Sequence, residues 1–99
     1  MDSIDVAQVF AELGPAPAER QAQFAGQTVR LVRLRGEGGW HGHAAADETV
    51  LVWSGRFRVE YRGGGAVDLG PGQVCVVPRG REHRGVAPEG ADVVLFRAA

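Results

Sequence analysis

Most of the chain, from residue 27 to residue 97, has the alternation of hydrophobic and polar positions that is typical of β-strands. Phe57, Val59 and Tyr61 alternate with charged residues, which indicates a strand with one buried face. Further short apolar segments, separated by glycine and proline, cover residues 28–35, 49–53, 74–77 and 91–97. Fifteen glycines and five prolines place turns at short intervals between these segments. The spacing predicts an all-β sandwich or barrel.

The first part of the chain has a different period. Residues 4–13 carry apolar side chains at three- and four-residue steps, which predicts a helix with one narrow apolar stripe made of Val6, Val9, Phe10 and Leu13. Ser3 or Asp2 can cap its start, and Gly14 with Pro15 ends it. We expect a second short helical turn over residues 17–24, because a proline near the start of such a segment favours a helix.

These patterns divide the chain into an N-terminal helical segment packed on the barrel, residues 1–26, and a β domain, residues 27–99. The helix is either a lid or partner-binding element or a cover for one end of the barrel. The cover is the preferred interpretation, because an amphipathic helix usually buries its stripe against the domain it belongs to.

Composition narrows the class of protein. Ninety-nine residues fit one domain with a small core, for which oligomerisation is a plausible source of stability. The net charge of −1 and the absence of a basic block argue against nucleic acid as a partner. No apolar run approaches about twenty residues and no secretion signal is evident, so a membrane span is not expected. A single cysteine, Cys75, excludes an internal disulfide and suits the cytoplasm.

The candidate chemistry lies in two glycine-containing segments that hold all three histidines of the chain. His41 and His43 are two residues apart, so they point to the same side of an extended backbone. Glu48 lies at an odd spacing from them, and a turn over residues 44–47 is needed to bring its carboxylate to that side. His83 must come from a separate strand that the fold places alongside.

Three imidazoles and one carboxylate are a sensible ligand set for a divalent transition metal. His41, His43 and His83 would each provide a neutral ring nitrogen, and Glu48 an anionic oxygen. On a six-coordinate metal this set leaves two positions for water, substrate or dioxygen, whereas Zn²⁺ could be closed by the same four ligands. The sequence leaves the choice among Fe, Mn, Ni, Co, Cu and Zn open.

The two segments resemble the two motifs of the cupin superfamily, in the same order and with a short spacer. The first motif, H-x-H, Glu and a later glycine, matches His41, His43, Glu48 and Gly55. The second, Gly, Pro-x-Gly and His, matches Gly72, Pro78, Gly80 and His83, with Ala87 where the family usually has Asn. The likeness runs from about residue 29 to residue 97 and is greatest with small single-domain cupins. It implies a cupin jelly roll and the metal ligands just described.

Other polar and aromatic side chains near these motifs have plainer interpretations. Asp47 is expected to cap the turn rather than to orient a histidine. Tyr61 is the most plausible hydroxyl in a pocket, and Trp53 is expected between sheets or in a subunit interface. Arg79 and Arg81 flank Gly80 and could bind an anion, but loop arginines are more often solvated.

Two functions stay open at this point. One is a non-catalytic module that binds a metal or a small-molecule ligand, and the other is a metal-dependent enzyme of the dioxygenase or isomerase type. The absence of an evident acid–base residue beyond the metal ligands favours the binding module. We also expect a homodimer, because residues 49–53 and 91–97 are apolar on both faces and one helix stripe is too narrow to cover both. The resemblance implies pairing through such sheet faces.

Overall fold

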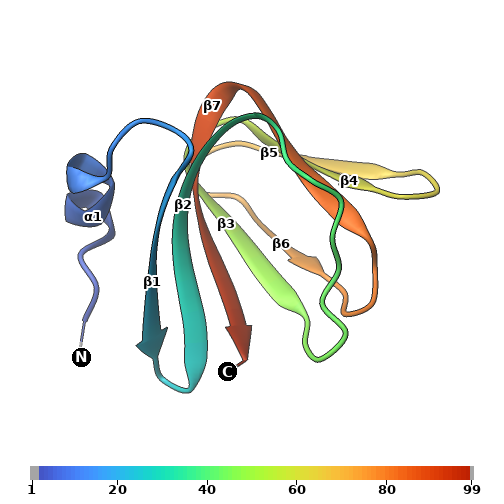
Figure 1. Cartoon of the computed structure of the whole chain (residues 1–99), viewed down its shortest axis with the longest axis horizontal. Coiled ribbons are helices and arrows are strands. Elements are labelled where there is room, and N and C mark those ends of the chain that lie inside the picture. The colour runs from blue at the N-terminus through green and yellow to red at the C-terminus, as the bar shows by residue number, and fades with distance from the viewer. Residues whose placement is uncertain (1–2, 99) are drawn as a thin grey trace.

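The computed structural model describes residues 3–98 and contains one short helix and seven strands within them (Figure 1). In chain order the elements are α1 (Val6–Glu12), β1 (Ala18–Phe24), β2 (Gln27–Glu37), β3 (Glu48–Gly55), β4 (Phe57–Tyr61), β5 (Ala66–Leu69), β6 (Val74–Val77) and β7 (His83–Ala98). The predicted all-β architecture with a short N-terminal helix is confirmed. Within residues 3–98 no helix is long and apolar enough to span a membrane.

All strand pairs are antiparallel, and their order is β1-β2-β7-β3-β6. The β4–β5 hairpin joins the first half of β7 through residues 83–86, whereas β3 joins the second half of β7 through residues 91–97. Because β7 is sixteen residues long and bends between these two halves, it belongs to both layers of the sandwich (Figure 1). The strand is longer than the predicted 91–97, and its first residue is His83.

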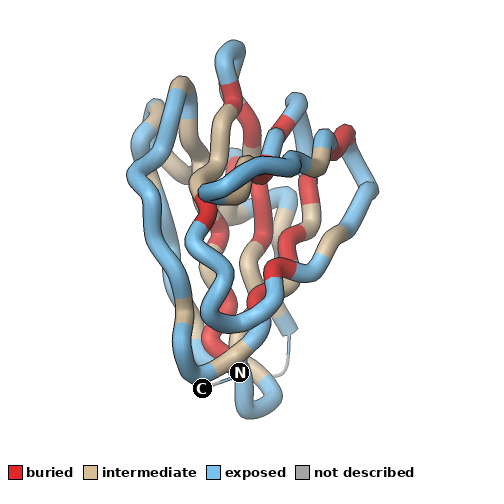
Figure 2. The backbone as a smooth tube through the Cα atoms, turned by 90° about the vertical axis from the view of Figure 1, so that its right-hand side faces the viewer, coloured by how far each residue is buried: buried red, intermediate tan, exposed pale blue. Residues whose placement is uncertain are grey.

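The main core lies between the two layers and consists of small and branched apolar side chains. Its buried members are Val50, Val52, Phe57, Val59, Leu69, Val77, Ala87, Ala91 and Val93. Buried positions follow the central strands while the connecting loops are exposed (Figure 2). On β3 the alternation is as predicted: Glu48 is 2% exposed and Val52 is fully buried, on the same inner face. The alternation that buries the valines therefore also carries the Glu48 carboxylate into the interior.

The helix packs on the outer face of the sheet rather than on an end of the barrel. Phe10 is buried there against Val29 and Leu31 of β2 and Val94 of β7. The helix begins two residues later than predicted, and its N-cap is Asp5, whose side chain accepts a hydrogen bond from the backbone N–H of Gln8 at 3.0 Å. A carboxylate at this position satisfies one of the unpaired N–H groups of the first turn. The predicted cap Ser3 is therefore wrong, and the alternative, Asp2, lies outside the described residues.

The predicted helical turn over residues 17–24 is wrong, because residues 18–24 form the strand β1. Each residue from Ala18 to Phe24 is paired with β2, in the register Ala18↔Arg33 to Phe24↔Gln27. The composition of this segment favours a helix, but pairing with the edge of β2 satisfies a whole row of backbone groups, and tertiary context overrides propensity. The division of the chain at residue 26 stays a prediction.

The glycine of the first motif, Gly55, is required by both its backbone angle and its surroundings. It has φ +82°, and a Cβ there would collide with the carbonyl oxygen of Gly90 on β7. Gly63 has a similar φ of +88°, but a Cβ there would meet nothing within 4 Å. The two positions therefore share the cost of a left-handed backbone, and only Gly55 adds a collision.

We expect Gly55→Ala to lower the free energy of unfolding by about 1–3 kcal/mol more than Gly63→Ala does, because overpacking against backbone is added to the angular strain. Urea denaturation of the two variants and the wild type measures the difference. Equal losses at the two positions would show that the close approach of Gly55 to Gly90 does not matter.

Candidate metal centre

The first and third histidines are placed by a small piece of sheet outside the main strands. The N–H of His41 donates to the carbonyl of His83 at 2.9 Å, and the N–H of His83 donates back to the carbonyl of His41 at 2.8 Å. Gly42 follows in the chain, and a Cβ there would lie 3.4 Å from the carbonyl oxygen of Arg81. The pairing fixes the two histidine backbones side by side, as the separate-strand expectation for His83 required.

The turn between His43 and Glu48 is tied to the second motif. The N–H of Gly80 donates to the carbonyl of His43 at 2.8 Å. The N–H of Arg79 donates to Oδ1 of Asp47 at 2.9 Å. Asp47 therefore ties the turn to the loop before His83, whereas the sequence predicted that it would cap its own turn. Because the turn interrupts the strand, the side chain of Glu48 points to the same side as that of His43 despite the odd spacing between them.

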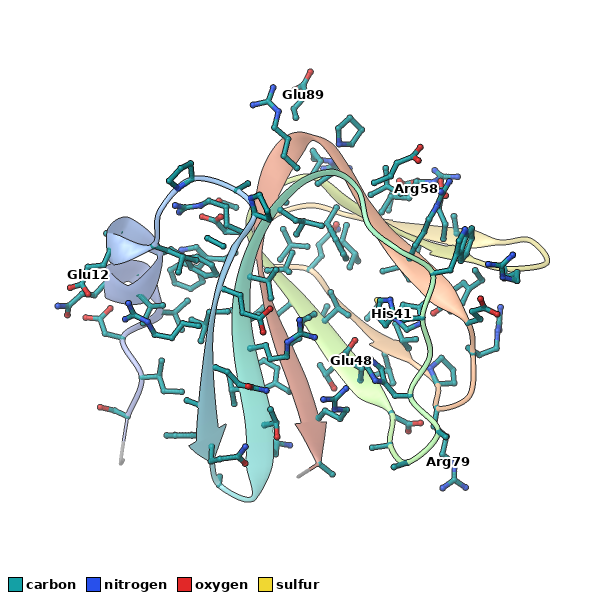
Figure 3. The ribbon with its side chains drawn as sticks, viewed as in Figure 1. Glu12, His41, Glu48, Arg58, Arg79 and Glu89 are labelled. Carbon is teal, nitrogen blue, oxygen red and sulfur yellow. The ribbon has the colours of Figure 1, made fainter. Side chains whose placement is uncertain are left out.

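The four predicted ligands come together at one end of the barrel. His41, His43, Glu48 and His83 each offer a ligand atom, and these atoms lie within 4.8 Å of one another. The ring centroids of His41 and His83 are 4.3 Å apart, and those of His41 and His43 are 5.3 Å apart. Figure 3 shows His41 on the loop after β2 and Glu48 at the start of β3, on the same side of the molecule. The cluster is positioned to form a metal site.

Backbone carbonyls fix the tautomers of two of the histidines. Nδ1 of His41 lies 3.0 Å from the carbonyl oxygen of Gly39, and Nδ1 of His83 lies 2.9 Å from that of Arg81. A carbonyl only accepts, so each Nδ1 carries the proton and each Nε2 is left with its lone pair. This is the arrangement in which neutral imidazole ligates a metal, with the other nitrogen held by an outer partner.

Glu48 supplies the observation that tests whether the site fits a metal. Its carboxylate is buried, and Oε2 has no hydrogen-bond partner within residues 3–98. The carboxylate oxygens lie 3.4 Å from Nε2 of His43 and 3.9 Å from Nε2 of His83. A buried carboxylate oxygen without a hydrogen-bond partner destabilises the folded state unless a cation binds to it. Together with the unprotonated Nε2 atoms of His41 and His83, it gives a donor set that fits a divalent transition metal.

Arg97 is a member of this site that the sequence reading missed. Its Nη1 lies 2.6 Å from Nδ1 of His43 and 4.0 Å from Oε2 of Glu48. Burial lowers the pKa of His43, the Glu48 carboxylate opposes that shift, and the Arg97 guanidinium adds to it, so the ring is neutral at neutral pH. The alternation along the last strand could have found it. Val93 and Leu95 face the core, so Arg97, two residues further, is expected on the same face.

Tyr61 and Cys75 lie beside the cluster without joining it. The Tyr61 ring is 6.4 Å from that of His83, and the Arg81 guanidinium lies 4.1 Å from the Tyr61 ring centroid. Burial raises the pKa of Tyr61, and the nearby Cys75 adds to this while Arg81 opposes it. Burial also raises the pKa of the Cys75 thiol, which lowers the fraction of reactive thiolate.

A cavity of about 280 Å³ opens beside His41 inside the barrel. Its walls are mainly apolar and include Phe57, Val93 and Leu95. One charged side chain, Arg30 of β2, also lines it. Of the four clustered residues, His41 is the one that lines the cavity.

The fold and this cluster define a cupin. The Cupin domain family model matches residues 30–97, and the chain belongs to that family. Among solved structures, protein NMB1881 from Neisseria meningitidis is 26% identical with a TM-score of 0.93, over 99% of this chain and 100% of that one. A cupin-2 domain containing protein from Shewanella frigidimarina is 27% identical with a TM-score of 0.87, over 97% of this chain and 94% of that one.

A third solved structure is an enzyme. Hydroquinone 1,2-dioxygenase from Sphingomonas, with 4-hydroxybenzoate bound, has a TM-score of 0.74 over 96% of this chain and 72% of that one. Its sequence is 20% identical, so the likeness shows the fold alone. None of the curated proteins matches this chain in sequence.

Proposed function

We propose that this cupin binds one divalent transition metal through His41, His43, Glu48 and His83. The observation that carries the proposal is the buried Oε2 of Glu48, which accepts no hydrogen bond within residues 3–98 and lies in a cluster with three imidazoles. Mixed nitrogen and oxygen donors suit Fe, Mn, Ni, Co, Cu and Zn, and the donor set by itself does not choose among them. A bound metal would supply a Lewis acid to whatever small molecule reaches it.

The working role that we propose is binding of a small organic ligand next to the metal. The cavity beside His41 supports this role, since ligand sites are concave, mostly apolar and carry a few polar groups. Its volume of about 280 Å³ restricts the ligand to a small molecule.

The alternative is a metal-dependent enzyme of the dioxygenase or isomerase type. The exposure of His41 and the opening of the cavity beside it favour a metal position that substrate can reach. A closed shell would have favoured a purely structural metal. Turnover of a small ligand by the metal-loaded protein, against the metal-free protein, separates the enzyme from the binding module.

Elemental analysis of the purified protein, with and without added metals, tests the proposal. We expect one metal per chain in the wild type, and much less in Glu48→Gln and His83→Ala. Glu89→Gln is the matched control, because Glu89 is exposed on the far side of the molecule from Glu48 (Figure 3). Equal metal content in the wild type and His83→Ala would refute the four-ligand assignment.

We also propose that the protein is a homodimer that pairs through the outer face of β3 and β6. Trp53 is 44% exposed, Val74 54% and Val76 53%. β6 pairs with β3 and is itself an edge strand, and only one of its faces is turned to the core. The apolar cluster under the helix reaches only as far as Leu51, which is half-buried there. The helix therefore leaves Trp53, Val74 and Val76 uncovered. A contiguous apolar surface of this kind is typical of an association surface.

We expect the wild type to sediment as a dimer at micromolar concentration and Val76→Lys to sediment as a monomer. A lysine at the centre of an apolar interface loses its hydration without gaining a partner. Glu89→Lys, a change at an exposed residue of β7 that is not part of β3 or β6, serves as control and should stay a dimer. A wild type that is monomeric in sedimentation equilibrium at this concentration would overturn the proposal.

A further inference from the structure

The charges around the cavity do not balance once a divalent metal is bound. Glu48 contributes one negative charge, and the three histidines are neutral as ligands. Arg97 contributes a positive charge close to Glu48, and the positive charge of Arg30 is matched by Glu19, which it contacts at 2.7 Å. The loaded site therefore carries about two net positive charges inside a largely apolar barrel. Uncompensated charge in such surroundings is costly, so a bound anion is favoured.

Metal binding also frees Arg97. A guanidinium only donates, so in the contact at 2.6 Å the Nδ1 atom of His43 must accept. When Nε2 of a neutral His43 ligates a metal, the proton has to sit on Nδ1, and that atom can no longer accept. The contact with Arg97 is then lost, and the guanidinium becomes available to another acceptor. Within the described residues its Nε and Nη2 donate no hydrogen bond.

A second arginine, Arg30, lines the cavity, and part of its guanidinium makes no hydrogen bond. Arg30 binds Glu19 through Nε and Nη2, at 2.7 and 3.0 Å. Its Nη1 donates to no group in residues 3–98, and its side chain lines the cavity. The hydrogen bond to Glu19 raises the pKa of Arg30, and the charge of Glu48 adds to this shift. The cavity thus has Arg30 and His41 on its wall, and Arg97 is the diagonal neighbour of Arg30 on the same face of the β2–β7 pair, since Thr28 lies opposite Arg97 and Arg30 opposite Leu95.

The rest of the cavity wall determines what the anion must carry. Phe57, Val93 and Leu95 form an apolar surface that a bare inorganic anion would leave without a partner. The volume of about 280 Å³ is close to the lower end of ordinary ligand pockets. From these observations we infer that the ligand of this site is a small organic carboxylate, with its carboxylate directed to Arg97 and Arg30 and its apolar body against Phe57, Val93 and Leu95.

This inference rests on the proposed function, because the charge balance assumes a bound metal. The test measures the affinity of pairs of probes that differ in charge and not in shape, namely benzoate with benzamide and pentanoate with pentanamide. Calorimetric titrations are made on Co²⁺-loaded protein, whose metal content is checked by elemental analysis for each variant. The variants are Arg97→Gln and Arg30→Gln, with Arg97→Lys to retain the charge. The control is Arg35→Gln, an exposed residue of the same strand as Arg30.

We expect at least one carboxylate to bind the wild type about tenfold or more tightly than its amide, as charge-assisted hydrogen bonds require. Arg97→Gln and Arg30→Gln should each weaken the carboxylate and leave the amide unchanged, and Arg97→Lys should recover part of the loss. Arg35→Gln should behave as the wild type. Thermal melts of each variant show whether it is folded, and a variant that fails to fold is replaced by Arg97→Met or Arg30→Met, which also removes the charge.

Two results overturn the inference while the proposed function stands. In the first, the protein is fully loaded with Co²⁺ but binds carboxylates no more tightly than their amides, or binds neither. The other is a preference for carboxylates that survives in Arg30→Gln/Arg97→Gln, which would mean that the metal alone holds the anion. A wild type that takes up no Co²⁺ overturns the proposed function and this inference together.

Discussion

Saturating metal is expected to raise the melting temperature of the wild-type protein by roughly 15–30 °C, and a chelator to reverse the change. A ligand that binds only the native state adds about 4 kcal/mol at a thousandfold excess over its dissociation constant. For a domain of 99 residues each kcal/mol corresponds to about 4–8 °C. The four ligands come from three separate parts of the chain, so the unfolded state holds the metal poorly.

Glu48→Gln should lose most of this shift. The amide keeps the size of the side chain but removes the anionic ligand, and we expect metal affinity to fall by about a hundredfold or more. At the metal concentration used for the wild type, about 1.4 kcal/mol of the added stability would remain. The metal-free variant should be at least as stable as the metal-free wild type, because the buried charge and its unpaired oxygen are gone.

His83→Ala provides the second arm of the same experiment. It removes the ligand of the second motif and leaves those of the first, so its metal-dependent shift should be small as well. Melts are recorded by circular dichroism with chelator and with added metal, and Glu89→Gln is the control that should shift like the wild type. If the metal stabilised wild type and both variants equally, the ligand assignment would be wrong even though a metal binds somewhere.

Arg33→Met is expected to lower the free energy of unfolding by about 3 kcal/mol or more. The guanidinium binds both carboxylate oxygens of Asp92, at 2.8 and 3.0 Å. It also donates to the carbonyl oxygens at the end of α1 and just after it, those of Phe10, Leu13 and Gly14. Methionine retains the aliphatic stem but leaves the carboxylate and these carbonyls without their donor, and breaking such a pair costs more than the pair itself contributes.

Arg35→Met is the matched control, since Arg35 is an exposed residue two positions further along β2. Urea denaturation of both variants gives the comparison, and Arg33→Lys tests geometry, because one ammonium group cannot reach five acceptors. In Arg33→Met the helix should detach before the barrel unfolds. Hydrogen exchange at the amide of Phe10 should therefore speed up at urea concentrations that leave the barrel folded. A loss in Arg33→Met no larger than in Arg35→Met would mean that α1 is held by Phe10 and its apolar contacts alone.

The sequence by itself indicated β2, β3, β4, β6 and the second half of β7, together with the four candidate ligands. Alternation along residues 57–61 and 48–52 was sufficient because a period of two depends only on neighbours in the chain. Two histidines two residues apart converge for the same reason, and a turn of four residues was needed to bring Glu48 to their side. These are local relations, and the structure has all of them.

Only the tertiary structure decided what depends on pairing across the chain. Residues 18–24 became a strand because the edge of β2 was available to them. Arg97 meets His43 across 54 residues of sequence, and Arg33 meets Asp92 across 59. No local period specifies which strands lie side by side or in which register. The charges that complete the site, and the apolar face of β3 and β6 left uncovered beside it, were therefore fixed by the packing of distant segments.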